Sequence, residues 1–318
     1  GRGLKLYLLK RIVLLGPVLA GVTFLLFALM ELVPGDAAEA MLGPYATSDN
    51  VQRLRSSMNL EAPFPERYLF WIQNLVRLDL GEAYSIGRPV RDEVLERYSA
   101  TLILAGAAFA VALVVGVVCG VCAAAWKDRT IGRLFSLVSI LGISIPSFWL
   151  GLMFISLFSV ALGWFPSGGI GAIQGKGGAG DLLAHLFLPA MALGIVSSSV
   201  IAQFIRSAML EVLVSGYIRT ARAKGVEGFQ VLMSHAFRNV IPSILPLLGL
   251  QAGYVIGGAV YIETVFQWPG VGRMLVQAIQ SRDILLVQGG VLILGTSYLI
   301  INLITDVLQH VLDPRLSK

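Results

Sequence analysis

Charged residues are scarce in this 318-residue chain. Asp, Glu, Lys and Arg together make up 14% of it, whereas a typical soluble protein carries roughly 25%. Hydrophobic residues make up 56%, and the mean hydropathy is +0.78. A single water-soluble core does not bury so much apolar surface, so the composition argues against an ordinary soluble domain.

The residues that carry metal, redox and nucleophilic chemistry are also few. The three histidines, His185, His235 and His310, show no metal-ligand spacing, and no nucleophile, base and orienting group can be combined with them. Cys119 and Cys122 have Cys-x-x-Cys spacing, but they lie in an apolar segment where cysteine acts as a small hydrophobe. We therefore predict no catalytic residue, metal site or cofactor site in this chain.

A phosphate-binding loop is missing as well. Gly175 and Lys176 resemble the end of such a loop, but the pattern requires Gly where Ile170 stands and Ser or Thr where Gly177 stands. We therefore expect any ATP to bind to another protein.

Long apolar segments are what the chain does have. A helix needs roughly 20 mostly apolar residues to cross the hydrocarbon core of a bilayer. Six segments meet this length: 8–33, 101–126, 134–162, 188–205, 241–262 and 285–311. The first is longer than the ~7–15 apolar residues of a signal peptide, so we expect it to be retained. The sequence predicts an all-α, polytopic membrane protein with six transmembrane helices.

The distribution of positive charge predicts the orientation of these helices. If the N-terminus is cytoplasmic, the inside segments and adjoining helix ends hold 14 Lys and Arg, and the two short outside loops hold 3. An excess of Lys and Arg on the cytoplasmic side is the usual rule. We expect both termini in the cytoplasm. The net charge of +5 then reflects topology and lipid contact, and nucleic acid is not expected as a partner.

The predicted spans divide the chain into three regions. Residues 1–33 form the N-terminal segment and first span, 34–99 an external region, and 100–318 the transmembrane core, with the cytoplasmic segment 206–240. In the external region we expect helices over 48–59 and 66–78, which Pro63 and Pro65 separate. The Gly-rich loop 163–184 is typical of a flexible tether. Because the chain begins with Gly1 and not Met, we expect the natural protein to begin upstream.

The cytoplasmic segment 206–240 carries the most informative pattern. Two short helical stretches are expected on either side of Gly225 and Gly228, because Gly adopts the left-handed turn between helices at little cost. The first stretch is basic, and the second has an apolar face that includes Phe229 and Phe237. Such a pair suits docking on a soluble partner. It suits equally a helix that lies on lipid headgroups.

A resemblance favours the first of these interpretations. Residues 217–225, followed by His235-Ala-Phe-Arg-Asn239, resemble the coupling loop of ABC-importer permeases, in particular those of the dipeptide/oligopeptide/nickel family. That loop has an Ala-rich motif that ends in Gly, and Arg219 stands where many importers have an acidic residue. The resemblance assigns ATPase coupling to Tyr217, Arg219, Thr220, Ala221, Arg222, Ala223, Lys224, Gly225, His235, Arg238 and Asn239.

Further motifs resemble the same family along nearly the whole chain. They are Leu78-Asp-Leu-Gly81 with Arg88-Pro-Val90, Ile143-Ser-Ile-Pro-Ser-Phe-Trp149, His185-Leu-Phe-Leu-Pro-Ala190, Ile262-Glu-Thr-Val-Phe-Gln-Trp-Pro-Gly-Val-Gly-Arg273 and Asp313-Pro-Arg315. Each motif is weak alone, but their order and spacing are specific.

The resemblance implies a bacterial inner-membrane location, an assembly and an activity. This chain would pair as a heterodimer with a second, homologous permease. The two permeases would combine with two ATPases that bind ATP and Mg and with an external substrate-binding protein. The permeases alternate between inward-facing and outward-facing states. Relatives carry dipeptides, oligopeptides, glutathione or nickel, and we expect peptides by family frequency.

Polar residues within or beside the spans are candidates for the substrate route, because such groups tend to face cavities. The candidate translocation path comprises Ser198 with its neighbours Ser197 and Ser199, and Gln203, Gln251, Asn302 and Asp306. Hydrogen bonding between helices explains them equally well. The candidate external gate or binding-protein contact comprises Glu263, Trp268, Pro269, Gly270 and Arg273. A turn-stabilising ion pair between Glu263 and Arg273 is the alternative.

A different class of protein is a stand-alone secondary transporter or channel. It would need inverted repeats with broken helices, or rings of like residues. The sequence shows no clear internal repeat and no paired carboxylates in the spans. This class is therefore the less favoured alternative.

Overall fold

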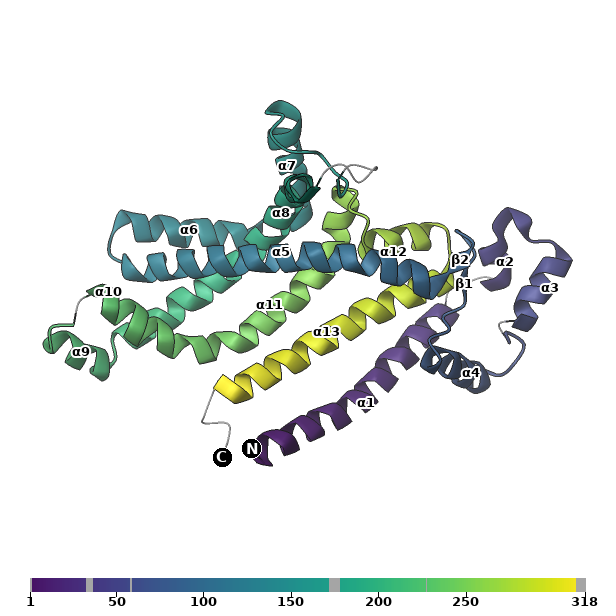
Figure 1. Cartoon of the computed structure of the whole chain (residues 1–318), viewed down its shortest axis with the longest axis horizontal. Coiled ribbons are helices and arrows are strands. Elements are labelled where there is room, and N and C mark those ends of the chain that lie inside the picture. Colours follow the sequence, from purple (N-terminus) through teal and green to yellow (C-terminus); the bar gives the residue numbers. More distant parts are fainter. Residues whose placement is uncertain (1, 33–36, 58, 172–177, 227, 313–318) are drawn as a thin grey trace. The chain divides into compact units, whose positions relative to one another are not determined.

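A computed structural model describes residues 2–32, 37–57, 59–171, 178–226 and 228–312. The middle of the predicted tether, with Lys176, and the C-terminal motif Asp313-Pro-Arg315 lie outside these residues. Nearly all of the described chain is helical, as Figure 1 shows, so the predicted all-α class is confirmed.

Five long apolar stretches in the described residues can each cross a membrane. They lie in α1 (Arg2–Glu31), α5 (Val90–Ala125), α8 (Gly178–Leu213), the continuous stretch Gly228–Val265 and α13 (Ile284–Leu312). The predicted segments are found, but α5 and α8 begin well before their predicted starts and α8 also ends later. Both helices are longer than a bilayer requires, so their length could not be read from the apolar run alone.

The third predicted span, 134–162, is not one straight helix. It consists of α6 (Thr130–Ser144), α7 (Ser147–Phe154) and the π-helix η2 (Ile155–Ala161), with a bend of 104° between α6 and the pair that follows. Pro146 stands at the bend and is the N-cap of α7. Proline disfavours a helical conformation in the residue before it, and Ile145 is accordingly extended, with φ −93° and ψ 123°. Counted as one broken span, this pair brings the total to six.

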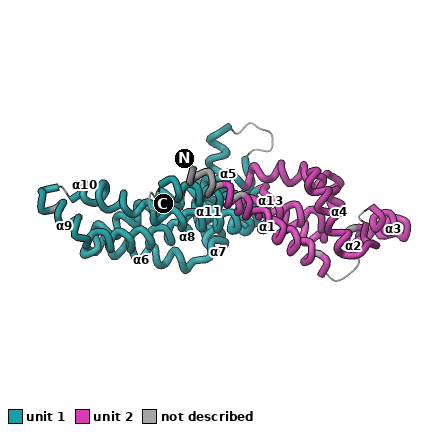
Figure 2. The backbone as a smooth tube through the Cα atoms, turned by 90° about the horizontal axis from the view of Figure 1, so that it is seen from below, with its two compact units in different colours: residues 1–8, 102–268, 300–318 teal, residues 9–101, 269–299 magenta. Residues whose placement is uncertain are grey.

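The contacts divide the chain into two compact units, which Figure 2 shows in different colours. Unit 1 comprises Gly1–Leu8, Leu102–Trp268 and Ile300–Lys318. Unit 2 comprises Leu9–Thr101 and Pro269–Leu299. These boundaries differ from the three regions expected from the sequence, because α1, α5 and α13 each contribute residues to both units.

Helix α8 is the centre of unit 1. It packs against α6, α7 and α11 (Arg238–Val265), and its middle is almost continuously buried. Leu193, Ile201, Ile205 and Met209 are fully buried along it. Pro189 in α8, like Pro242 and Pro246 in α11, stands inside a helix. Neighbouring helices can satisfy the backbone groups that such prolines free.

Small residues let the helices of unit 1 approach α8 closely. A Cβ at Gly116 of α5 would lie 2.8 Å from the Ile201 side chain, and one at Gly120 would lie 2.8 Å from the Ala202 carbonyl oxygen. A Cβ at Gly142 of α6 would overlap the Ser199 hydroxyl. Lipid provides no hydrophobic drive between helices, so membrane helices associate through close van der Waals packing at small residues.

Unit 2 contains the external region predicted from the sequence. Its short elements are α2 (Ala37–Leu42), the 3₁₀ turn η1 (Gly43–Tyr45), α3 (Ser48–Ser57), α4 (Phe64–Val76), α12 (Val271–Gln280) and the antiparallel strands β1 (Glu82–Ala83) and β2 (Arg88–Pro89). Helices α3 and α4 confirm those expected over 48–59 and 66–78. Pro63 caps α4 and Pro65 lies in its first turn, where a missing N–H costs nothing.

Aromatic rings join α4 to the end of α1 within unit 2. Phe24 and Phe27 of α1 meet Phe64 and Tyr68 of α4 edge to face, with ring centroids 5.4 to 5.9 Å apart. Such pairs stabilise beyond their buried area by about 0.5–1.5 kcal/mol. The hydroxyls of Thr23 and Tyr68 are also hydrogen-bonded, at 3.0 Å. The end of the first span is therefore fixed by rings as well as by aliphatic packing.

Buried carboxylates fix the rest of unit 2. Asp283 is 1% exposed; its Oδ1 accepts a hydrogen bond from the Leu286 N–H at the start of α13, and its Oδ2 accepts two from Ser85. Glu93, 3% exposed, lies between the guanidinium groups of Arg88 and Arg97. A buried carboxylate requires such partners, because an unpaired buried charge is strongly destabilising.

We predict that Gly120→Ala destabilises the chain, because the added methyl group would press against the backbone of α8. Overpacking of this kind costs about 1–3 kcal/mol. Gly106→Ala in the same helix is the matched control, since nothing lies within 4 Å of its Cβ position. Replacing a helical Gly by Ala in open space stabilises by roughly 0.5–1 kcal/mol.

The measurement is the thermal unfolding midpoint of each variant in detergent. The midpoint should fall for Gly120→Ala and stay level or rise for Gly106→Ala. Equal midpoints for the two variants would contradict the close α5–α8 packing.

Candidate functional site

The predicted coupling segment lies in unit 1 as a sequence of short helices. These are α9 (Gly216–Ala223), α10 (Gly228–Gln230) and the π-helix η3 (Val231–Phe237), which leads directly into α11. The two helical stretches expected on either side of Gly225 and Gly228 are therefore present. The residues of the predicted coupling set lie in α9, in the turn at Gly225, in η3 and at the start of α11.

Gly225 ends α9 in a backbone conformation that other residues rarely adopt. Its φ is +81°, and the next N–H, of Val226, donates to the Ala221 carbonyl at 3.2 Å. This bond spans six residues and is the one that defines a Schellman helix ending, in which the left-handed residue is usually Gly. For other L-residues the left-handed conformation costs roughly 1–2 kcal/mol.

A hydrogen-bond network then ties α9 back to the start of α11. The Tyr217 hydroxyl donates to the His235 carbonyl at 3.4 Å. The Asn239 amide donates to the Tyr217 hydroxyl at 3.1 Å and to the same His235 carbonyl at 2.5 Å. Tyr217, His235 and Asn239 therefore form one hydrogen-bond network, which connects α9 to the start of α11.

The coupling helices bury one side and expose the other. Ile218, Val231 and Ala236 are at most 1% exposed, so the pair is anchored in unit 1 by small and aliphatic side chains. The exposed members of the predicted set are Tyr217, Arg219, Thr220, Ala223, Lys224, Gly225, Arg238 and Asn239. Ala221 and His235 are half-buried, and the side chain of Arg222 lies outside the described part.

Phe229 adds an apolar group to this basic surface. It stands in α10 and is 75% exposed. A basic helix, α9, followed by a short helix with an exposed aromatic ring can dock into a cleft on another protein and transmit a displacement.

The proposed path residues divide into two groups. The Ser198 hydroxyl donates to the Ile195 carbonyl of its own helix at 2.7 Å, and the Gln203 amide donates to the Ser136 carbonyl of α6 at 3.0 Å. The Gln203 bond is of the kind that the alternative interpretation expects, hydrogen bonding between helices, whereas the Ser198 bond lies within α8. Gln251 of α11 and Asn302 and Asp306 of α13 are half-buried, which is compatible with either interpretation.

Two buried hydroxyls in the same region have no hydrogen-bond partner among the described residues. They belong to Ser136 of α6 and Ser197 of α8. Ser197 was predicted as a neighbour of the path residue Ser198, whereas Ser136 was not predicted. A polar residue inside the apolar segment 134–162 was the signal that could have found it, since a hydroxyl in a span calls for a partner.

The proposed gate residues are divided between the units. Glu263 and Trp268 in unit 1 are both fully buried, and the Trp268 N–H donates to the Glu263 carbonyl at 2.8 Å. Neither side chain is accessible to an external protein in this structure. Pro269, Gly270 and Arg273 belong to unit 2, where Gly270 is the N-cap of α12 and Arg273 is half-buried.

Together, the spans and the loops define the class of protein. In unit 1, α6, α7 and α11 pack against the buried helix α8, one apolar span is broken, and a short exposed helix pair precedes α11. This is the architecture of a multi-pass, all-helical membrane permease.

Comparison with known proteins identifies the family. The chain belongs to the binding-protein-dependent transport system inner membrane components, whose family description matches residues 96–318, and the corresponding N-terminal family matches residues 4–105. It is therefore the permease subunit of an ABC importer.

Curated relatives match the chain from end to end. A Brucella abortus protein that carries the provisional name peptide transport system permease protein is 41% identical over 309 residues, 97% of this chain and 98% of the relative. A Brucella suis protein, provisionally named a peptide permease, is 37% identical over 98% of both chains. The glutathione transport system permease protein GsiC of Escherichia coli is 36% identical over 97% of both.

A solved structure supports the fold. A chain of the MetNI methionine ABC transporter, in an inward-facing conformation, matches 69% of this chain and 96% of its own length with a TM-score of 0.55. The sequence identity is 18%, so this likeness concerns the fold alone.

We predict that Asn239→Leu loosens α9 without unfolding the chain. The change removes the two hydrogen bonds that Asn239 donates in this network, and each contributes about 1 kcal/mol. Hydrogen exchange followed by mass spectrometry should show faster exchange over 216–226. Gln230→Leu, an exposed residue of α10, is the control and should leave exchange over 216–226 unchanged. Unchanged exchange in Asn239→Leu would show that the network does not hold α9.

Proposed function

We propose that this permease carries di- or oligopeptides into the bacterial cytoplasm. The observation that carries the proposal is the match to peptide-permease relatives, at 41% and 37% identity over 97% and 98% of the chain. Family membership implies partner ATPases and an external substrate-binding protein. ATP and Mg bind to those ATPases, and the chain itself contributes the route across the membrane.

Glutathione is the second candidate substrate. The relative named for glutathione transport is 36% identical over 97% of the chain, nearly as similar as the peptide permeases. Glutathione is itself a tripeptide, so both candidates share a free amino group, amide bonds and carboxylates. Nickel has less support, because none of the relatives compared above is named for it.

The proposed route of energy transfer is the segment from Tyr217 to Asn239. Arg219, Arg222, Lys224 and Arg238 would pair with acidic groups on an ATPase, and Gly225 would set the angle at which α9 meets it. Two conformations with different contacts at both ends are needed for such coupling. The Schellman ending and the Tyr217–His235–Asn239 hydrogen-bond network support this role. They connect α9 to η3 and α11, so that these helices would move together.

The same proposal places the remaining parts of the molecule. Both termini and segment 206–240 lie in the cytoplasm, and region 34–99 lies outside. A second, homologous permease completes the route, which Gln251, Asn302 and Asp306 would line. Glu263, Trp268, Pro269, Gly270 and Arg273 would form the outer gate.

We predict that Gly225→Asp uncouples transport while the protein remains in the membrane. An Asp side chain makes φ +81° costly and puts a negative charge at the end of the basic helix, so α9 would end at a different angle and meet its partner poorly. Uptake of a radiolabelled tripeptide should fall roughly tenfold or more, the factor that corresponds to about 1.4 kcal/mol. Ala221→Asp should act in the same direction by adding a negative charge to the basic helix.

Gly228→Asp is the matched control. It places the same side chain three residues away, at a glycine with ordinary φ and nothing within 4 Å of its Cβ position. Wild-type uptake by Gly225→Asp at equal membrane abundance, or equal loss in Gly228→Asp, would contradict the role of the turn.

A second prediction separates an ABC importer from a stand-alone carrier. A tagged chain, purified in mild detergent from its own organism, should bring with it an ATPase that has a full phosphate-binding loop. Tripeptide uptake by proteoliposomes that hold the tagged chain together with this ATPase, the second permease and the binding protein should require ATP. Sustained uptake by the single chain without ATP would overturn the proposal.

A further inference from the structure

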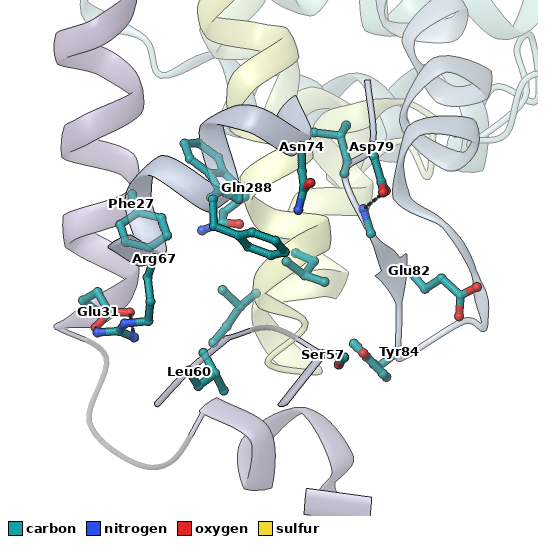
Figure 3. A pocket seen from close by; sticks show the side chains of 16 residues that line it. Phe27, Glu31, Ser57, Leu60, Arg67, Asn74, Asp79, Glu82, Tyr84 and Gln288 are labelled. Atoms are coloured by element: carbon teal, nitrogen blue, oxygen red, sulfur yellow. Dashed lines mark hydrogen bonds and ion pairs between the residues drawn. The ribbon is translucent and has the colours of Figure 1, made fainter. Parts of the chain in front are cut away.

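A cavity of about 410 Å³ lies within unit 2, and Figure 3 shows it from close by. It is enclosed by the end of α1, the segment between α3 and α4, α4 itself, the stretch around β1 and the start of α13. Small-molecule sites have volumes of roughly 300–1,000 Å³. None of the residues assigned above to coupling, path or gate lines it.

Part of the cavity wall is apolar and aromatic. Phe27, Phe70 and Trp71 line it, together with Leu60 and Leu285. The rings of Phe27 and Trp71 lie 5.5 Å apart at an angle of 37°. Aromatic faces of this kind accommodate aliphatic groups and attract cations.

The polar part of the wall carries an excess of negative charge. The acidic residues Glu31, Asp79 and Glu82 line the cavity, against the single guanidinium group of Arg67, and Figure 3 shows the Glu82 carboxylate directed away from it. Arg67 is already bound to Glu31 by two hydrogen bonds of 2.6 and 2.5 Å, so its charge is compensated there. Asp79 accepts a hydrogen bond from the Gly81 N–H but gains no positive charge by it.

Tyr84 lies at the edge of the cavity. Partial burial raises the pKa of its phenol, a hydrogen bond with Ser57 opposes this, and the nearby carboxylates of Glu82 and Asp283 raise the pKa further. The contribution of the carboxylates has the sign that also favours a protonated amine, whereas burial acts on an amine in the opposite direction.

Gln288 supplies the observation that points to a ligand. It is 5% exposed, it lines the cavity, and its Oε1 has no hydrogen-bond partner among the described residues. Figure 3 shows its amide among the side chains that surround the cavity. A buried acceptor without a donor costs about 1–3 kcal/mol, so a donor is missing at this position. The Nε of Arg67 is likewise a buried donor without a partner among the described residues.

We propose that this cavity binds the protonated amino end of a short peptide, an inference that rests on the peptide cargo proposed above. The ammonium group would compensate the carboxylates and donate to Gln288 Oε1. The first side chain would lie against Phe27 and Trp71, and a peptide carbonyl would accept from Arg67 Nε. The cavity is thus a second peptide-binding site, separate from the transmembrane route and from any pocket on the external binding protein.

The same chemistry, a primary ammonium on an apolar body, occurs in phosphatidylethanolamine headgroups. The test therefore uses the purified full-length chain in nanodiscs of phosphatidylcholine alone. Binding of trialanine and N-acetyl-trialanine is measured by isothermal titration calorimetry, and a second set of nanodiscs contains phosphatidylethanolamine.

Trialanine should bind saturably in both kinds of nanodisc, and acetylation of its amino group should weaken binding at least tenfold. Equal affinities for the two peptides, or no saturable binding of trialanine, would overturn the proposal. Binding that disappears once phosphatidylethanolamine is present would also overturn it, because a lipid headgroup would then be the occupant.

Variants locate the binding in this cavity. Gln288→Leu and Asp79→Asn should each weaken trialanine binding roughly tenfold, whereas Gln277→Leu and Glu66→Gln, exposed residues of unit 2 outside the cavity, should not change it. Asp79 is itself exposed, so its variant keeps the test decisive if the buried Gln288→Leu fails to fold. Wild-type affinity in Asp79→Asn and in any folded Gln288→Leu would overturn the assignment.

Uptake assays separate this inference from the proposed cargo. If cells take up peptide but the isolated chain does not bind trialanine, the cavity site alone is rejected. If the isolated chain binds trialanine through its amino group and Gln288→Leu weakens this binding, but cells import no peptide, the cargo is rejected and the ammonium site stands.

Discussion

The hydrocarbon interior of the bilayer requires every backbone N–H and C=O group to find its partner within the protein, and this requirement organises unit 1. It makes continuous helices the default and confines breaks to places where neighbours can satisfy the freed groups. The bend at Pro146 is one such place. Because lipid is as apolar as the side chains, the helices are held by close contact, and Gly116 and Gly120 let α5 approach the backbone of α8.

The same requirement decides where function can be placed. Turns, short helices and charged clusters are tolerated only outside the hydrocarbon or within protein, and the coupling segment and most of unit 2 have this character. In the coupling segment, Gly225 ends α9 and the Tyr217–His235–Asn239 network binds the loop to the start of α11. In the proposed coupling role, energy would arrive from an ATPase subunit, so rigidity at this short connection would matter more than its area.

Unit 2 is held together by a different kind of chemistry. Aromatic rings fasten α4 to the end of α1, and the buried carboxylates of Asp283 and Glu93 connect its short elements through hydrogen bonds and ion pairs. Satisfied polar groups of this kind act beside an aliphatic core in which Val90, Val271 and Met274 are buried. Two buried polar atoms of the cavity, Gln288 Oε1 and Arg67 Nε, stand out because they have no hydrogen-bond partner among the described residues.

The sequence by itself determined the class, the apolar spans, the helices of the external region and the Gly-centred turn of the coupling loop, since each depends on local composition or on one backbone conformation. The family resemblance in segment 217–239 also needed only local residues. Tertiary structure alone decided that α5 and α8 extend beyond the apolar runs, that Gln203 bonds α6, that Glu263 and Trp268 are buried, and that residues from α1, α4 and α13 share one cavity. These features depend on which distant segments meet, and hydropathy and spacing do not encode the partner of a side chain.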